Sequence, residues 1–204
     1  MADYKKAVPY YLKKEGGLSR ATTDTASKNP APCTINGKTG WHTNKGVTWT
    51  TFKGNAAALG YSATCENFRI MPASIWGVIY KKKYWDFWGS DNIPFQAIAD
   101  FLTWTVWGSG GGSFNGASGS IPHWKNFLKR NYNYSATSKS DILRKLLELA
   151  EQKGERAIWE EMIQYRYDWY VRLNQPANLR GWRNALDGYK KWGLENYDFK
   201  KKSE

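Results

Sequence analysis

The sequence contains no long hydrophobic run. None of its apolar stretches approaches the roughly 18 to 20 residues needed to span a bilayer. The N-terminal residues 1–6 are not followed by the apolar stretch of a secretory signal peptide. We therefore expect a soluble protein that is made in the cytoplasm and has no recognisable Sec signal.

Cysteine and histidine are also scarce. The chain has two cysteines, Cys33 and Cys65, and two histidines, His42 and His123. Because there is no Cys-x-x-Cys motif and no histidine pair at metal-ligand spacing, we expect no metal site and no cofactor. Reduced thiols are the default for a cytoplasmic protein, with a Cys33–Cys65 disulfide as the alternative. Both histidines are expected to be structural or surface groups, although His42 is next to Thr43 and within reach of a site there.

Acidic residues are fewer than basic ones: the chain has 18 Asp and Glu and 30 Lys and Arg, which gives a formal net charge of +12. Such a charge attracts polyanions, among them nucleic acid, anionic lipid and bacterial wall polymers. The chain also has 12 Trp and 13 Tyr. Most of these rings are expected in the core, and some to line a groove, where they stack on sugars or bases.

Hydrophobic residues recur at helical spacing through most of the chain, which predicts a mainly α protein. Helices are expected at residues 4–15, 49–59, about 72–83, about 94–107, from Ser140 to about 150, 158–173 and 179–192. Asn36-Gly37 predicts a hairpin within the polar segment 18–47. The Gly- and Ser-rich residues 108–120 are typical of a flexible connection and suggest a boundary there.

A carboxylic acid, Glu15, stands where the first amphipathic segment stops at Gly16-Gly17. Glycoside hydrolysis needs a protonated carboxyl group that donates to the leaving oxygen, and commonly a second carboxylate. The end of an apolar helix removes water from a carboxyl group and so favours its protonated form. Asp24, nine residues later in a polar loop, is expected to stay ionised. Together the two acids suit a glycosidase.

Each residue alone has an ordinary structural interpretation. Glu15 follows Lys13 and Lys14 and by itself is more often a solvated helix end, and Asp24 by itself is more often a loop or cap residue. The polar turn over residues 43–48, which leads into a helix, makes the combination informative.

This combination resembles glycoside hydrolase family 108, a family of N-acetylmuramidases once labelled secretion activators. The family begins with a helix ending in Glu-Gly-Gly, has an acidic residue about nine positions later, and then a Thr-Asn-x-Gly-[Ile/Val]-Thr turn. The matching positions are residues 15–17, Asp24 and residues 43–48. The segment between Asp24 and Thr43 is longer here than in the family. Further similarity extends over residues 84–110 and 166–192.

The resemblance implies a lysozyme-like muramidase region at residues 1–115 and a helical, peptidoglycan-binding-like region at residues 116–204, or one compact unit. It implies hydrolysis of the β-1,4 bond between N-acetylmuramic acid and N-acetylglucosamine, with Glu15 as general acid. Asp24 and Thr43 would orient water or stabilise the transition state. Sugar contacts are predicted for four further side chains: Trp41, Asn44, Trp85 and Trp107.

The expected partner is bacterial peptidoglycan, on which a phage or prophage lysin would act at the cell wall. Two other functions fit parts of the sequence. One is a non-catalytic wall-binding protein on the same fold. The other is a basic nucleic-acid-binding protein, which we disfavour because Lys and Arg are scattered and no DNA- or RNA-binding motif is present.

Overall fold

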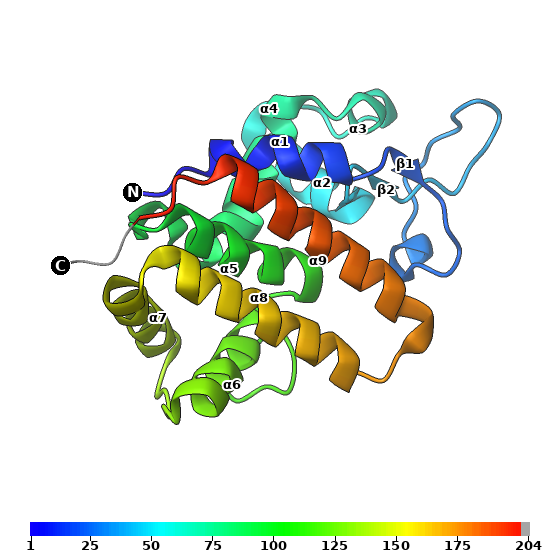
Figure 1. The fold of residues 1–204 in the computed structure, drawn as a ribbon. Helices are drawn as coiled ribbons and strands as arrows, with labels where there is room; N and C mark the ends of the chain where they lie inside the picture. Colours follow the sequence, from blue (N-terminus) through cyan, green and yellow to red (C-terminus); the bar gives the residue numbers. More distant parts are fainter. Residues whose placement is uncertain (201–204) are drawn as a thin grey trace. The chain divides into compact units, whose positions relative to one another are not determined.

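The computed structural model describes residues 1–200, and it is mainly helical, as the sequence predicts (Figure 1). Its α-helices are α1 (Tyr4–Lys14), α2 (Trp49–Ala56), α3 (Cys65–Ile70), α4 (Ala73–Tyr80), α5 (Gln96–Ser109), α6 (Ser120–Tyr132), α7 (Lys139–Lys153), α8 (Glu155–Arg172) and α9 (Pro176–Asn196). The strands are β1 (Leu18–Ser19), β2 (Thr43–Asn44) and β3 (Val47–Thr48).

Contacts between Cα atoms divide the chain into two compact units. Among the described residues, one unit consists of residues 5–83, and the other of residues 1–4 together with residues 84–200. The functional boundary near residue 115 that the sequence suggests stays a prediction.

The unit of residues 5–83 is built around aromatic side chains. Trp49 and Phe52 of α2 pack against Phe68 of α3, with ring centroids 5.3 to 5.7 Å apart. Trp76 and Tyr80 of α4 are stacked at 5.1 Å, and both are fully buried. Such ring pairs bury large apolar areas, so they stabilise the packing of α2 against α3 and the position of α4.

That sheet is antiparallel, in the order β1-β2-β3. Lys45 and Gly46 have φ of 47° and 75° and form a two-residue turn between β2 and β3. Thr48 then caps α2, because its side chain accepts the Thr51 N–H at 3.2 Å. The polar turn that leads into a helix is therefore confirmed.

Helices α5 to α9 form the other unit. The buried helix α5 contacts α6 and α8, while α8 also packs against α7 and α9 (Figure 1). Phe101 of α5 contacts Trp124 of α6 and stacks on Tyr189 of α9, at centroid distances of 5.6 and 5.3 Å. Most predicted helices of this part are confirmed, and α6 was not predicted.

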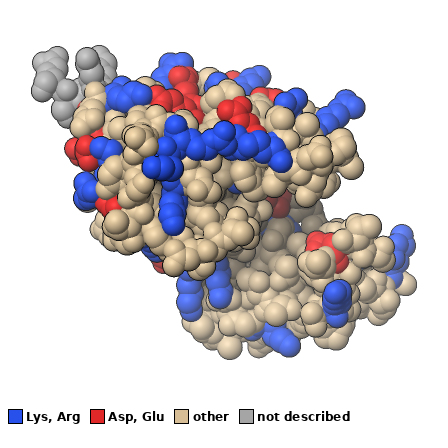
Figure 2. Space-filling model, turned by 90° about the horizontal axis from the view of Figure 1, so that it is seen from below, with Lys and Arg blue, Asp and Glu red and all other residues tan. Residues whose placement is uncertain are grey.

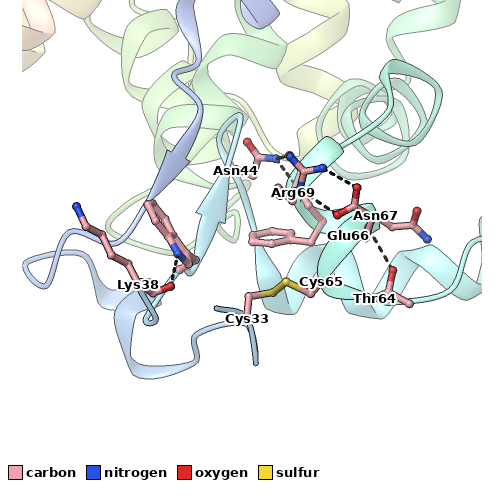
Figure 3. The surroundings of a disulfide bond; sticks show 10 residues. Cys33, Lys38, Asn44, Thr64, Cys65, Glu66, Asn67 and Arg69 are labelled. Atoms are coloured by element: carbon pink, nitrogen blue, oxygen red, sulfur yellow. Dashed lines mark hydrogen bonds and ion pairs between the residues drawn. A yellow bond between two sulfur atoms is a disulfide. The ribbon is translucent and has the colours of Figure 1, made fainter. Parts of the chain in front are cut away.

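The default expectation of reduced thiols is wrong, because Cys33 and Cys65 form a disulfide with Cα atoms 5.5 Å apart. The bond joins the segment between Asp24 and Thr43 to the first residue of α3 (Figure 3). A fold that brings two Cα atoms to this distance permits the bond, whereas a separation of 32 residues in the sequence gives no such indication.

Within residues 1–200, no helix is both long and apolar enough to cross a membrane. In the same part of the chain, no group of three or more His, Cys, Asp or Glu side chains is arranged to hold a metal ion.

Candidate functional site

Glu15 lies at the C-terminal end of α1, where its backbone N–H donates to Tyr11 O at 2.7 Å. The side chain is half-buried and is followed by the exposed Gly16 and Gly17. The negative end of the helix dipole disfavours a second negative charge at this place. The predicted position of Glu15 at a helix end is confirmed.

Strand pairing brings Thr43 to the segment that follows Glu15. Ser19 of β1 is paired with Thr43 of β2, and Leu18 with Asn44. Residues that are directly paired project from the same face of a sheet, so Thr43 shares a face with Ser19. Beyond the strands, the Lys45 N–H donates to Gly17 O at 3.3 Å. The turn is therefore hydrogen-bonded to Gly17, which is two residues after Glu15 in the sequence.

His42 connects Thr43 to the loop of Asp24. Its ring is fully buried, with Nδ1 2.9 Å from Thr43 Oγ1 and Nε2 3.1 Å from Ala21 O. The same Ala21 carbonyl accepts the Asp24 N–H at 3.1 Å. The sequence placed His42 within reach of the site, but its partners become visible only in the fold.

Asp24 is exposed and caps a short 3₁₀ helix at residues 25–28. Its Oδ1 accepts the Ala26 N–H at 2.9 Å. The structural interpretation of Asp24 as a cap is thus correct. Because a cap of this kind uses one carboxylate oxygen, the second oxygen remains able to accept a hydrogen bond from water.

Asn44 and Lys45 fasten the turn to α3. Asn44 is buried and its Nδ2 donates to the carbonyls of Phe68 and Arg69 at 2.6 and 2.9 Å. The Lys45 Nζ donates to the carbonyls at the end of the same helix. These bonds satisfy carbonyls that a helix end leaves unpaired, so both side chains have a structural role whatever else they contact.

A groove of about 570 Å³ adjoins the turn within the unit of residues 5–83. It is lined by residues from the segment after Glu15, from the segment that carries Cys33, from the turn and from α3: Gly17, Leu18, Thr34, Ile35, Asn36, Asn44, Lys45, Cys65, Glu66 and Arg69. The Asn36-Gly37 turn, with φ of 51° and 70°, confirms the predicted hairpin and forms part of this lining. The longer segment between Asp24 and Thr43 therefore builds one wall of the groove.

Charges of both signs face each other on the α3 side of the groove. Arg69 donates to both carboxylate oxygens of Glu66, at 2.9 and 2.6 Å (Figure 3). This hydrogen bond from Arg69 lowers the pKa of the Glu66 carboxyl group. Because both side chains remain exposed, the pair is available to polar groups of a ligand.

The three tryptophans predicted to contact sugar lie in different surroundings. Trp41 is half-buried, and its indole N–H donates to Lys38 O at 2.8 Å. Trp107 is half-buried beside Tyr84. Trp85 is fully buried and donates to Asp91 at 2.7 Å. Trp41 belongs to the same unit as Glu15, while Trp85 and Trp107 belong to the other unit.

Comparisons with known proteins concern the fold and the family of this chain. The structure of SagA from Brucella abortus is similar over 95% of this chain and 94% of that chain, with a TM-score of 0.58 and 16% identity. At this identity the likeness concerns the fold. No curated protein matches the chain. The family model described as Glycosyl hydrolase 108 matches residues 8–110, which include the Glu15 helix end, Asp24 and the Thr43 turn. Because that match spans half of the sequence, the chain belongs to the glycosyl hydrolase 108 family.

Proposed function

We propose that this chain is a lysozyme-like N-acetylmuramidase, which hydrolyses the β-1,4 bond between N-acetylmuramic acid and N-acetylglucosamine in bacterial peptidoglycan. The observation that carries the proposal is the position of Glu15 at the end of α1, beside the strands that hold Thr43, in a member of a glycosyl hydrolase family.

In the proposed reaction the Glu15 carboxyl group donates its proton to the glycosidic oxygen as the bond from that oxygen to the anomeric carbon breaks. A water molecule forms the new bond to the anomeric carbon and gives up a proton. The Asp24 carboxylate accepts that proton, and Thr43 Oγ1 accepts a second hydrogen bond from the water. This division of labour is that of inverting glycoside hydrolases, in which one carboxyl group is the acid and the other activates water.

The groove beside the turn supplies room for the glycan. Its lining includes polar side chains, among them Asn36 and the Glu66–Arg69 pair. Sugar hydroxyl and acetamido groups donate and accept hydrogen bonds, as these side chains do. Trp41 and Asn44 are retained as proposed sugar contacts, since both lie in the unit of Glu15.

The net charge of +12 suits a protein that works on an anionic wall. Figure 2 shows Lys and Arg side chains scattered over the face in view, with fewer acidic ones among them. Such a charge raises the local concentration of the protein at a negatively charged polymer. The bacterial cell wall is therefore the proposed site of action.

The test compares wild type with Glu15→Gln on purified peptidoglycan, scoring the release of new reducing ends. Gln has nearly the shape of Glu but no carboxyl proton to donate. We expect wild type to release reducing ends, and Glu15→Gln to bind walls equally well while its kcat falls by roughly 10² to 10⁴-fold.

Glu151→Gln is the matched control, because Glu151 is an exposed residue of α7 in the other unit. This variant should keep wild-type activity. If wild type binds walls and releases no reducing ends, the chain is a wall-binding protein and the proposal is wrong. If Glu15→Gln keeps full activity, another residue is the acid.

A further inference from the structure

His42 has hydrogen-bond partners for both ring nitrogens although no part of it is exposed. Ala21 O is a carbonyl oxygen and only accepts, so Nε2 carries a proton and donates to it. In the neutral ring Nδ1 is then an acceptor, and the Thr43 hydroxyl donates its hydrogen to Nδ1. For a neutral ring, the arrangement thus fixes both the tautomer and the direction of the Thr43 O–H bond.

The backbone of His42 is held as firmly as its ring. Its N–H donates to Ser19 O at 3.1 Å, and its carbonyl accepts the Trp49 N–H at 2.7 Å. The residue is therefore tied to β1 on one side and to the start of α2 on the other. Because both its backbone and its ring are hydrogen-bonded, His42 can hold the groups that it contacts in one geometry.

The Ala21 carbonyl extends this link to Asp24. It accepts the His42 Nε2–H and the Asp24 backbone N–H, each at 3.1 Å. An unbroken path of hydrogen bonds thus runs from the Thr43 hydroxyl through the imidazole to the loop of Asp24. The two groups proposed to handle the attacking water are positioned by one side chain.

We infer that His42 is a positioning residue, which holds the Thr43 hydroxyl as a pure acceptor toward water and fixes the loop of Asp24. This inference rests on the proposed function. With its hydrogen directed to Nδ1, Thr43 Oγ1 offers only lone pairs to a water molecule. A water that gives one hydrogen to Thr43 and the other to Asp24 keeps an oxygen lone pair for the anomeric carbon. His42 itself gains and loses no proton in the reaction.

The hydrogen-bond pattern is tested without any substrate. The chain has only two histidines, so ¹⁵N-labelled imidazole signals are assigned with one variant, His123→Asn. We expect a slowly exchanging Nε2–H on His42 and an Nδ1 signal that shifts when the acceptor bond is lost in Thr43→Val. A proton on Nδ1 in place of Nε2, or an Nδ1 signal that is unchanged in Thr43→Val, would overturn the inference.

The consequence for catalysis is tested by the kinetics of two variants of His42, each of which keeps one of its two side-chain hydrogen bonds, to Thr43 or to Ala21 O. The Asn side chain of His42→Asn can place an oxygen near the position of Nδ1, and the Gln side chain of His42→Gln can reach Ala21 O but has no acceptor near Thr43. We expect His42→Gln to lower kcat roughly 10- to 100-fold with little change in KM, as expected for misplaced reacting groups. His42→Asn should retain more of the activity.

Combining substitutions separates positioning from general destabilisation. If His42 acts through Thr43, the double variant His42→Gln/Thr43→Val loses no more kcat than Thr43→Val alone. His123→Asn is the matched control: His123 is also buried, and burial places the pKa of its ring well below the ordinary value. That variant should keep kcat even where its melting temperature falls.

The outcomes distinguish this inference from the proposed function. A wild-type protein that releases no reducing ends contradicts the proposed function, while the ¹⁵N pattern still decides whether His42 orients Thr43. An active wild type together with a His42→Gln variant of unchanged kcat, or with fully additive losses in the double variant, overturns the positioning role alone.

Discussion

At the scale of single residues, the positions of Glu15 and Thr43 could be predicted from the sequence, and the contacts of His42 could not. The position of Glu15 follows from a helix that stops at two glycines, and the turn at Thr43 follows from the Asn-x-Gly pattern. Both signals are local in sequence. The role of His42 depends on a carbonyl 21 residues away, and no pattern in a single sequence reports such a contact.

Asp24 permits a substitution that removes its charge and keeps its cap. Asn is as good a cap as Asp, so Asp24→Asn should retain the hydrogen bond from Ala26 and the melting temperature. Loss of the carboxylate should lower kcat by roughly 10² to 10⁴-fold. The measurement is reducing-end release alongside thermal denaturation.

Asp24→Ala is the control for the cap, and it should destabilise the fold by about 1 kcal/mol in addition to losing activity. An Asp24→Asn variant with wild-type kcat would remove Asp24 from the proposed mechanism.

At the scale of elements, most helices were predictable from the sequence pattern, and α3 and α6 were not. Helices α7 and α9 carry clear periodic stripes, and α5 is a long apolar segment. The six-residue α3 buries only Phe68, which is too little to produce a period. Helix α6 follows a Gly- and Ser-rich run and has Pro122 in its first turn, where proline is tolerated.

The disulfide should contribute most of the stability of the groove wall. It closes a loop of 32 residues between Cys33 and Cys65, and the entropy removed from the unfolded chain corresponds to about 3 to 4 kcal/mol. We expect Cys33→Ser/Cys65→Ser to lower the free energy of unfolding by this order, as measured by urea denaturation.

Reduction of the disulfide by dithiothreitol is the control for the double substitution. It should destabilise wild type to a similar extent and leave the double variant unchanged. Equal urea midpoints for oxidised wild type and the double variant would show that the bond contributes no stability.

Glu155 joins the start of α8 to the start of α5. The buried carboxylate accepts the Ala97 N–H at 2.7 Å and the Lys200 N–H at 2.9 Å. Burial raises the pKa of Glu155 above 4.5, and the two backbone hydrogen bonds oppose that shift. Above pH 4.5 the folded state therefore holds more of this proton than the unfolded state, so the contribution of Glu155 to stability falls as the pH rises through the folded pKa.

Substitution Glu155→Gln keeps a hydrogen-bond acceptor and removes the titration. The variant should show a smaller decline in the free energy of unfolding than wild type as the pH rises from 4.5 toward neutrality, measured by urea denaturation at several pH values. Identical pH slopes in the two proteins would contradict the assignment of this proton to Glu155.

At the scale of the whole molecule, composition left the class of ligand and the reaction open. The charge of +12 and the content of 12 Trp are equally compatible with nucleic acid and with wall glycans. The chain belongs to the glycosyl hydrolase 108 family, and the muramidase activity is the function that we propose for it. In the proposed function, the way the glycan lies along the groove decides which bond is cut, and neither composition nor motif spacing indicates that direction.

The central claim is best tested by identifying the sugar at each new reducing end. Peptidoglycan is digested with wild type, the released ends are reduced with borohydride, and the fragments are analysed by mass spectrometry. The account predicts reduced N-acetylmuramic acid at the new ends, absent from a Glu15→Gln digest. Reduced N-acetylglucosamine at those ends, or the same fragments from Glu15→Gln, would contradict it.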